Sequence, residues 1–412
     1  PSPTMPQTKP IFVAATRQHV GKTTVALAIM SGLRKRFRRV GFIKPVGQQH
    51  ITVDDQKTGQ QIRVDKDVEV LKEFFNLSHI DYSTMSPVII PRGYTSKYID
   101  GEMTSESQES AIRQAFATQN EQSDVVLVEG TGHVGVGSVV EMSNARAASL
   151  VGADVVLVAN GGLGKAFDEL EMNRQMFERE GVAVRGVVLN KVLHDKVDMV
   201  REKMGKLLRQ RWGVPLLGVV PDLPFLGEAS LRELEKHLGG ELVAGGERAR
   251  DLHYKLHDAF LVTTGLRRFL RRAFTDRLGV GSDRPLFIAH STRDDLLLGY
   301  LAHWQRAGPR GSDWPGDWAG AFVLSTGASK SFPDPFAPAE DLELSTYLRR
   351  MANDTDAPVL ITPMGPVDAL EAIKGYTAKH NKDNFDRVRA AIEHYEPAID
   401  FDLLLNEQST GY

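Results

Sequence analysis

A Gly-Lys-Thr triplet near the start of the chain is the group of residues with the clearest chemistry. Gly21, Lys22 and Thr23 follow an apolar run at 11–15 and open a helical pattern at 24–37. Backbone N–H groups at the start of a helix point at an anion, and the helix dipole favours negative charge there. In this setting a lysine neutralises the outer phosphates of a nucleotide, and a threonine hydroxyl binds Mg²⁺. The triplet therefore predicts a loop that binds a nucleotide together with magnesium.

One position departs from the usual phosphate-loop pattern, G-x-x-x-x-G-K-[ST]. Thr16 stands where the first glycine is expected. Threonine does not easily adopt a positive φ angle, so the loop needs a different local backbone. The alternative is an incidental triplet at a helix start, but the preceding strand and the following helix favour the motif. The residues expected to line the nucleotide phosphates are Thr16, His19, Val20, Gly21, Lys22, Thr23 and Thr24.

Two charged side chains are expected beside the phosphates. Lys44 lies in a second strand pattern at 40–46, and Glu129 lies near the end of an apolar run at 124–130. Phosphoryl transfer depends mainly on positioning and charge neutralisation, so we expect Lys44 and Lys22 to face phosphate oxygens as the catalytic residues. Glu129 stands where such folds place an acid directed at magnesium, and a solvent-exposed carboxylate is the alternative.

A second acidic ligand for magnesium is expected from one of three aspartates. Asp67 begins a helical pattern, so a metal ligand and a helix N-cap are equally good interpretations of this residue. Asp54 and Asp55 stand in the polar, loop-like stretch before it and are rival candidates. The spacing alone leaves this choice open.

Gly130 and Gly132 begin a run of alternating glycines directly after Glu129. Such a run lets backbone N–H groups approach an anion closely, and we prefer this interpretation to a flexible surface loop. Asn160 and Asn190 each end a predicted strand. A side-chain amide at such a place can contact the edge of a purine base, and Asn190 is the stronger candidate.

Continuous apolar strands separated by amphipathic helices organise the first part of the chain. Strands without alternation indicate a parallel sheet that is covered by helices on both faces. Ligands bind such sheets at the carboxyl ends of the strands, where the polar candidates fall. We therefore expect an α/β fold with a P-loop NTPase sheet and a second, smaller α/β domain. The strand patterns of the sheet lie at 11–15, 40–46, 124–130, 155–159, 182–190 and 215–220.

A glycine-rich stretch at 239–246 marks the expected domain boundary. A chain of 412 residues is long for one compact domain, so two are expected. The predicted divisions are a tail at 1–9, a P-loop domain at 10–240, a linker with a helix at 241–280 and a smaller α/β domain at 281–412.

The composition excludes several classes of function. The formal net charge of −3 argues against general affinity for nucleic acids or acidic membranes. The chain has no cysteine, which excludes disulfides, thiolate metal sites and a cysteine nucleophile. No apolar stretch has the length of a membrane span, and the start of the chain is a polar tail rather than a signal peptide. We expect a soluble protein of a reducing compartment, and the sequence does not separate the cytoplasm from a plastid or mitochondrial lumen.

Five stretches together carry a family resemblance. Residues 10–225 resemble the dethiobiotin synthetase-like branch of P-loop ATPases, which includes the amino-terminal domain of long bacterial phosphate acetyltransferases. This branch accepts a residue other than glycine at the position of Thr16. The stretches, which match the family in order and spacing, are 16–23 (Thr-Arg-Gln-His-Val-Gly-Lys-Thr), 41–46 (Gly-Phe-Ile-Lys-Pro-Val), 128–132 (Val-Glu-Gly-Thr-Gly), 186–190 (Gly-Val-Val-Leu-Asn) and 219–221 (Val-Val-Pro).

The resemblance implies roles for individual residues. It implies that the nucleotide is ATP, with Lys22 and Thr23 as phosphate and magnesium residues and Lys44 as a second phosphate-site lysine. It further implies Asp67 and Glu129 as magnesium ligands, Asn190 as a contact to the base, and an adenine pocket near Pro221. The family's Gly-Ala-Gly-Gly after the acid is here Gly-Thr-Gly-His, and His133 argues against the carboxylation of diaminopelargonate.

Residues from about 280 to 405 resemble a small module called the DRTGG domain. The expected Asp-Arg appears within 292–295 as Thr-Arg-Asp-Asp, and the expected Thr-Gly-Gly appears at 326–328 as Thr-Gly-Ala. The resemblance implies a regulatory or assembly role without catalysis. The acetyl-transferring domain that follows this module in phosphate acetyltransferases is expected to be absent.

Three functions remain in view. The first is a ligase-like ATPase that activates a small carboxylate or amine, with a substrate that the sequence does not name. The second is a nucleotide-sensing regulatory or scaffold subunit. The third is a cobyrinate-type amide synthase, which lacks support because glutamine use in that family needs a cysteine and this chain has none. The resemblance also implies a homo-oligomer or a protein partner.

Overall fold

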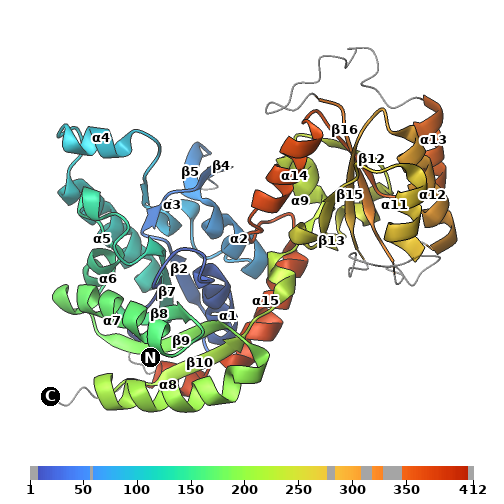
Figure 1. Ribbon diagram of the computed structural model, residues 1–412. Helices are drawn as coiled ribbons and strands as arrows, with labels where there is room; N and C mark the ends of the chain where they lie inside the picture. The colour runs from blue at the N-terminus through green and yellow to red at the C-terminus, as the bar shows by residue number, and fades with distance from the viewer. Residues whose placement is uncertain (1–7, 56–58, 276–283, 308–317, 328–345, 407–412) are drawn as a thin grey trace. The chain divides into compact units, whose positions relative to one another are not determined.

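The computed structural model describes residues 8–55, 59–275, 284–307, 318–327 and 346–406. The chain forms two compact units, and each contains a sheet of its own (Figure 1). The first unit comprises residues 1–223 together with 380–412, and the second comprises 224–379. Within the described ranges, no helix is long and apolar enough to cross a membrane.

The first unit is built on a parallel sheet in the order β10-β9-β8-β1-β7-β2. All five residues of its strand β1 are at most 1% exposed, so both faces of the sheet are covered. This confirms the expected α/β fold, and it explains why the strands are continuously apolar. The strands are β1 (Ile11–Ala15), β2 (Val40–Ile43), β7 (Val125–His133), β8 (Asp154–Asn160), β9 (Val184–Val192) and β10 (Leu216–Pro221).

Helices connect the strands of this sheet, and local signals fix their ends. The side chain of Thr104 caps the start of α5, and that of Ser143 caps the start of α6. Gly213 ends α8 with a positive φ angle. The helices are α1 (Lys22–Arg34), α2 (Lys66–Phe75), α3 (Tyr82–Met85), α4 (Tyr94–Ile99), α5 (Ser105–Gln122), α6 (Asn144–Leu150), α7 (Gly164–Arg179) and α8 (Val197–Trp212).

The polar stretch before α2 forms a β-hairpin where the sequence suggests a loop. Strands β4 (His50–Asp54) and β5 (Gln61–Asp65) pair antiparallel. The five residues of β4 are exposed or half-buried, so their polar side chains conceal the strand in the sequence. Two further short strands, β3 (Val46–Gly47) and β6 (Val88–Ile89), pair in parallel. Strand β3 precedes the hairpin in the sequence, and β6 follows it after α2 and α3.

The last described part of the chain, residues 380–406, belongs to the first unit. It contains α15 (Phe385–Tyr395), η6 (Glu396–Ala398) and α16 (Phe401–Leu405). Helix α15 packs against α1, and a bridge joins Ile399 to Gly218 of β10. The expected division at 281–412 therefore differs from the structure, because these long-range contacts return the chain to the first sheet.

The second unit has a five-stranded sheet in the order β12-β17-β16-β15-β14. Strand β12 is antiparallel to β17, and the remaining pairs are parallel. The strands are β12 (Glu241–Ala244), β14 (Ala259–Leu261), β15 (Leu286–His290), β16 (Ala321–Ser325) and β17 (Val359–Thr362), with a separate pair β11 (Ala229–Ser230) and β13 (His253–Tyr254). The helices are α9 (Leu231–His237), α10 (Gly246–Arg250), α11 (Leu266–Leu270), α12 (Asp294–Ala307), α13 (Thr346–Thr355) and α14 (Pro366–Gly375).

The stretch 241–280 differs from the expected linker and helix. Its first residues form β12 at one edge of the second sheet, and residues 259–261 form β14 at the other edge. The glycines at 239–246 are turns on either side of β12, with positive φ angles at Gly239 and Gly245. Glycine clusters mark tight turns as well as linkers, so the sequence signal has two meanings.

Candidate functional site

The phosphate-loop candidate connects β1 to α1 with positive φ angles at His19 (61°) and Gly21 (96°). Thr16 continues the strand pairing, since its N–H donates to the Val158 carbonyl at 3.0 Å. This position therefore has no need of a glycine. At Gly21 a Cβ atom would lie 2.3 Å from Nδ2 of Asn190, so both the backbone angle and the close approach require glycine there.

A strand outside the loop fixes the loop's conformation. Asn190, near the end of β9, is completely buried, and its Nδ2 donates to the Val20 carbonyl at 2.7 Å. The neighbouring Lys191 donates from Nζ to the His19 carbonyl at 3.0 Å. Asn190, expected to contact the base, thus orients the phosphate loop with its amide nitrogen.

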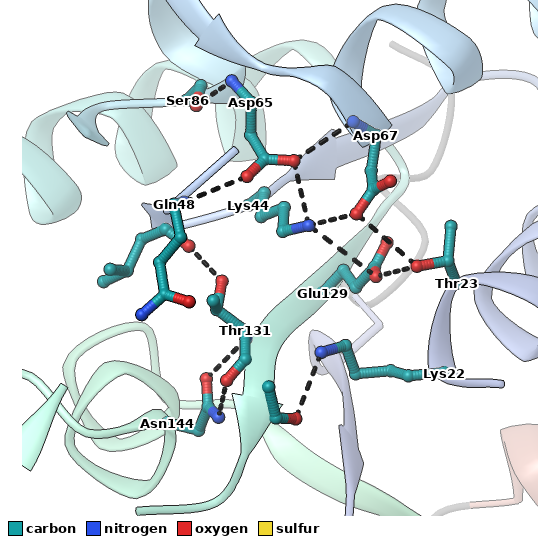
Figure 2. Close-up of polar contacts among 12 residues, drawn as sticks. Lys22, Thr23, Lys44, Gln48, Asp65, Asp67, Ser86, Glu129, Thr131 and Asn144 are labelled. Carbon is teal, nitrogen blue, oxygen red and sulfur yellow. Dashed lines mark hydrogen bonds and ion pairs between the residues drawn. The ribbon is translucent and has the colours of Figure 1, made fainter. Parts of the chain in front are cut away.

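Charged side chains from four further segments meet beside the loop: the end of β2, the end of β5, the start of α2, and β7 (Figure 2). Lys44 follows β2, and its Nζ lies 2.9 Å from Oδ1 of Asp65 and 4.0 Å from Oε1 of Glu129. It also pairs with Asp67. The Thr23 hydroxyl of α1 donates to Glu129 Oε1 at 2.7 Å. These five side chains form one contiguous group, which we call the acid–lysine cluster.

Lys22 approaches the same region from the loop. Its Nζ donates to the Gly132 carbonyl at 3.3 Å. Thr23 Oγ1 also lies 3.5 Å from Oδ2 of Asp67, so the hydroxyl faces both carboxylates that the family resemblance implies as magnesium ligands. The structure thus brings Lys22, Lys44, Thr23, Asp67 and Glu129 together at one place beside the loop.

Burial and charge pull the protonation equilibria of the cluster in different directions. Burial raises the pKa of Glu129 to about 7, although Lys44 opposes the change. Burial also lowers the pKa of Lys22 to about 8, against the attraction of Glu129. For Lys44, burial acts downward, but Asp67, Glu129 and Asp65 together hold its pKa well above the ordinary value. The cluster therefore keeps Lys44 charged.

Asp67 responds to the same lysine. Burial by itself raises the pKa of this carboxyl group, but the charge and hydrogen bond of Lys44 outweigh burial and lower the pKa to about 2. Two carboxylates in one cluster thus differ strongly in acidity, because Lys44 contacts Asp67 directly and lies farther from Glu129.

The cluster offers the oxygen donors that magnesium prefers. Thr23, Asp67 and Glu129 supply one hydroxyl and two carboxylates, which suit a hard cation. Oε2 of Glu129 is buried without a hydrogen-bond partner, so it is available to a cation. In the part of the chain that the structure describes, no group of three or more His, Asp or Glu side chains is arranged to hold a metal by itself. A bound magnesium ion would therefore need oxygens from a nucleotide or water as well.

The N-cap of α2 is Asp65, which the sequence reasoning missed. Its Oδ1 accepts from the Asp67 N–H at 3.1 Å, so the interpretation of Asp67 as the cap is wrong. The hairpin register pairs Asp65 with His50 and Asp54 with Gln61. Asp54 and Asp55 therefore lie at the far end of the hairpin from the acid–lysine cluster. The signal that identifies Asp65 is its place just before the helix, at the end of an alternating strand.

The glycine run after Glu129 is locked by a second residue that the sequence reasoning missed, Asn144. Its Oδ1 accepts from the Thr131 N–H at 2.8 Å, and its Nδ2 donates to the Thr131 carbonyl at 2.8 Å. A Cβ atom on Gly130 would lie 2.7 Å from Oδ1 of Asn144. Gly132 presents its carbonyl to Lys22. The N–H of Thr131 is thus already bonded to Asn144 and is not free to bind an anion. The glycine run contacts the phosphate loop through the Gly132 carbonyl instead.

The two remaining candidates for base binding lie at the ends of the two strands that flank β9. Pro221 ends β10, and its carbonyl lies 2.9 Å from Nε2 of His394. Asn160 ends β8 directly beside Asn190, and its Oδ1 is buried without a hydrogen-bond partner.

Thr24, the last of the residues expected to line the phosphates, is the third residue of α1. Its hydroxyl oxygen lies 2.9 Å from Nε2 of His380.

Comparisons with known proteins identify relatives of the first part of the chain. Residues 9–230 match the family AAA_26, described as an AAA domain. A phosphate acetyltransferase of Nitrosomonas europaea is 27% identical over 245 residues, which cover 57% of this chain and 32% of the relative. An ATP-dependent dethiobiotin synthetase of Methanocaldococcus jannaschii is 24% identical over 214 residues, covering 51% of this chain and 92% of the relative. The corresponding enzyme of Clostridium perfringens is 25% identical over 240 residues and is covered to 99%.

Among solved structures, a plasmid partition protein of Borrelia burgdorferi bound to AMPPNP superposes with a TM-score of 0.34 at 12% identity. The superposition covers 53% of this chain and 88% of that protein. The chain spans about a third of the length of the phosphate acetyltransferases that it matches and nearly the whole of the synthetases. Because the family match includes more than half of the chain, the protein belongs to the AAA domain family AAA_26, with a P-loop domain related to dethiobiotin synthetases and phosphate acetyltransferases.

Proposed function

We propose that the first unit binds ATP together with Mg²⁺ and uses it to activate a small carboxylate or amine. The observation that carries this proposal is the acid–lysine cluster, in which Lys44, Thr23 and three carboxylates meet beside the phosphate loop. Lys22 and the start of α1 offer positive charge to a triphosphate, and the carboxylates around Lys44 offer oxygens to a magnesium ion bound with it. Positioning and charge neutralisation are what phosphoryl transfer demands of a protein.

Each residue has a defined task in this proposal. Lys22 and Lys44 neutralise phosphate oxygens, and Asn190 holds the loop in shape through Val20. Thr23, Asp67 and Glu129 would hold the magnesium ion, which supplies further neutralisation of phosphate charge when bound. The base lies near Asn190 and Pro221.

A nucleotide-sensing regulatory subunit is the second candidate. One observation favours it: the part of the chain that matches phosphate acetyltransferases corresponds to only a third of their length, and a separate α/β unit follows it. The residues of the DRTGG resemblance lie at the carboxyl ends of β15 and β16, where Arg293 forms an ion pair with Asp295. Ala328 of this pattern lies outside the described residues. In this candidate the second unit is a DRTGG-type regulatory or assembly module.

Calorimetric titration with ATP, with and without magnesium, tests the proposal when a phosphate-release assay follows on the same sample. Lys22→Ala should abolish binding while the protein stays folded, and Lys206→Ala, at an exposed lysine of α8, should bind like the wild type. Binding with steady phosphate release supports an enzyme and justifies a screen of small carboxylates and amines. Binding without release favours the regulatory candidate. Unchanged affinity for ATP in Lys22→Ala would refute the role of the phosphate loop.

The expected homo-oligomer is tested separately, by sedimentation of the protein with and without ATP.

A further inference from the structure

The segment 380–406 packs on α1 and β10 of the first unit, although it lies far outside the family match at 9–230. We propose that His380 and Tyr395 of this segment are positioning residues of the nucleotide site. His380 orients Thr24 in the first turn of α1, and Tyr395 orients Asn190, which in turn holds the phosphate loop. This inference rests on the proposed binding of ATP and adds to it a part of the chain that follows the second unit.

His380 fixes a hydroxyl beside the phosphate loop. Its Nε2 lies 2.9 Å from Oγ1 of Thr24, and the two residues are 8% and 7% exposed. A threonine hydroxyl has one proton to donate and two lone pairs to accept. When Nε2 carries the proton of the imidazole ring, Thr24 accepts it and keeps its own proton for a phosphate oxygen. The histidine therefore determines which way the hydroxyl of Thr24 can point.

Tyr395 acts on the loop through one intermediate residue. It is 2% exposed, and its hydroxyl lies beside the side chain of Asn190, whose amide opposes the effect of burial on the pKa of Tyr395. Asn190 donates to the Val20 carbonyl and lies so close to Gly21 that a Cβ atom there would meet it at 2.3 Å. A change in the orientation of Asn190 would therefore move the loop. Burial raises the pKa of Tyr395 to about 12, so its hydroxyl remains protonated at neutral pH.

Other contacts hold the segment to the first unit without involving the loop. The ring of Phe401 occupies the space beside Gly32, where a Cβ atom would meet it at 2.0 Å. Glu396 accepts from the Ser31 hydroxyl at 2.6 Å, and Ile399 forms the bridge to β10. These contacts hold the segment against α1 and β10. Buried polar groups cost free energy unless they are paired, so the buried contacts that this segment makes with Thr24 and Asn190, the two residues on either side of the phosphate loop's backbone, indicate a task beyond covering the helix.

Three variants of the full chain test the inference. Tyr395→Phe removes only the hydroxyl, His380→Leu removes the polar ring, and His380→Gln keeps a group that can donate and accept. A lost hydrogen bond in a binding site typically weakens affinity about three- to tenfold. We expect that loss in Kd for Mg-ATP in the first two variants and recovery in His380→Gln. Amide hydrogen exchange at 19–24 should become faster in the same two variants, while exchange in α8 stays unchanged.

Two controls remove hydrogen bonds of the same residue types at more exposed positions elsewhere. Tyr98→Phe removes a hydroxyl that donates to Glu141, and His237→Leu removes a ring that bonds to the Ala372 carbonyl in the second unit. Neither should change the affinity for ATP or exchange in the loop. Wild-type affinity and wild-type loop exchange in both Tyr395→Phe and His380→Leu would overturn the inference, as would a lowered melting temperature with unchanged Kd. If the wild type binds no ATP, the proposed function fails, and loop exchange alone then decides whether the two residues position the loop.

Discussion

Glu129 gives the sharpest prediction, because its burial opposes its charge. The side chain is 0% exposed, and burial raises its pKa from the ordinary value of 4.5 to about 7. One pKa unit corresponds to about 1.4 kcal/mol, so the ionised form costs the folded unit about 3 kcal/mol at pH 8. Glu129→Gln is neutral at every pH and nearly the same shape. The variant should therefore be more stable than the wild type at pH 8 when nucleotide and metal are absent.

The sign of the pH dependence follows from the raised pKa. Stability that depends on the protonated form is present below 4.5 and is lost as the pH rises through about 7. The advantage of Glu129→Gln should thus be largest at pH 8 and should shrink as the pH falls toward 4.5. For a unit of this size, about 3 kcal/mol corresponds to a shift in melting temperature of roughly 6–12 °C.

Thermal unfolding in EDTA at pH 8 and at pH 5 measures this effect. Glu121→Gln, at an exposed position of α5, is the matched control and should melt like the wild type at both pH values. Addition of Mg-ATP should then stabilise the wild type and stabilise Glu129→Gln much less, because the buried Oε2 no longer offers a charge to the cation. Equal stability of Glu129→Gln and wild type at pH 8, or the same gap at both pH values, would refute the reasoning.

Three further substitutions test other parts of the site. Gly21→Ala should lower the free energy of unfolding by about 1–2 kcal/mol and abolish ATP binding in calorimetry. The reason is that a Cβ atom on this residue, whose φ angle is 96°, would lie 2.3 Å from Nδ2 of Asn190. Wild-type affinity for ATP in this variant would contradict the loop geometry. Lys44→Met should cost about 3–5 kcal/mol in urea unfolding at pH 7 because it leaves buried carboxylates unpaired, and the deficit should shrink as the pH falls toward 2 and Asp67 is protonated. A deficit that is independent of pH would exclude that cause. Asn144→Ala should cost about 1–3 kcal/mol and weaken ATP binding by releasing the strand that Lys22 contacts, whereas unchanged affinity would show that the strand keeps its place without Asn144.

Local patterns were sufficient for the phosphate loop and the strands of the first sheet. A buried parallel strand must be apolar on both faces, so 11–15 and 125–130 are recognisable without knowledge of their neighbours. Gly21 and Lys22 are equally local, because the start of a helix creates the anion site by itself. The convergence of Lys44 and Glu129 also follows from sequence, since parallel strands end at one edge of the sheet.

Local sequence patterns did not separate the alternatives wherever the answer depended on which segments pair with each other in the folded chain. The choice between Asp65 and Asp67 as the N-cap depends on the direction in which β5 enters α2. The exclusion of Asp54 depends on the register of a hairpin whose polar strands carry a weak signal. Strands β12 and β14 are short strands at the edges of the second sheet. The residues around them are glycine-rich and polar, so the sequence resembles that of a linker.

The sequence by itself determined the α/β fold of the first unit, the phosphate loop, and the lysines and acids that meet beside it. Only the tertiary structure decided which residues hold that site in shape. Asn144 reaches the strand of Glu129, Asn190 reaches Val20, and His380 reaches Thr24 across 356 positions of sequence. No periodicity or spacing encodes such contacts, because they arise from the packing of distant elements that share no local pattern.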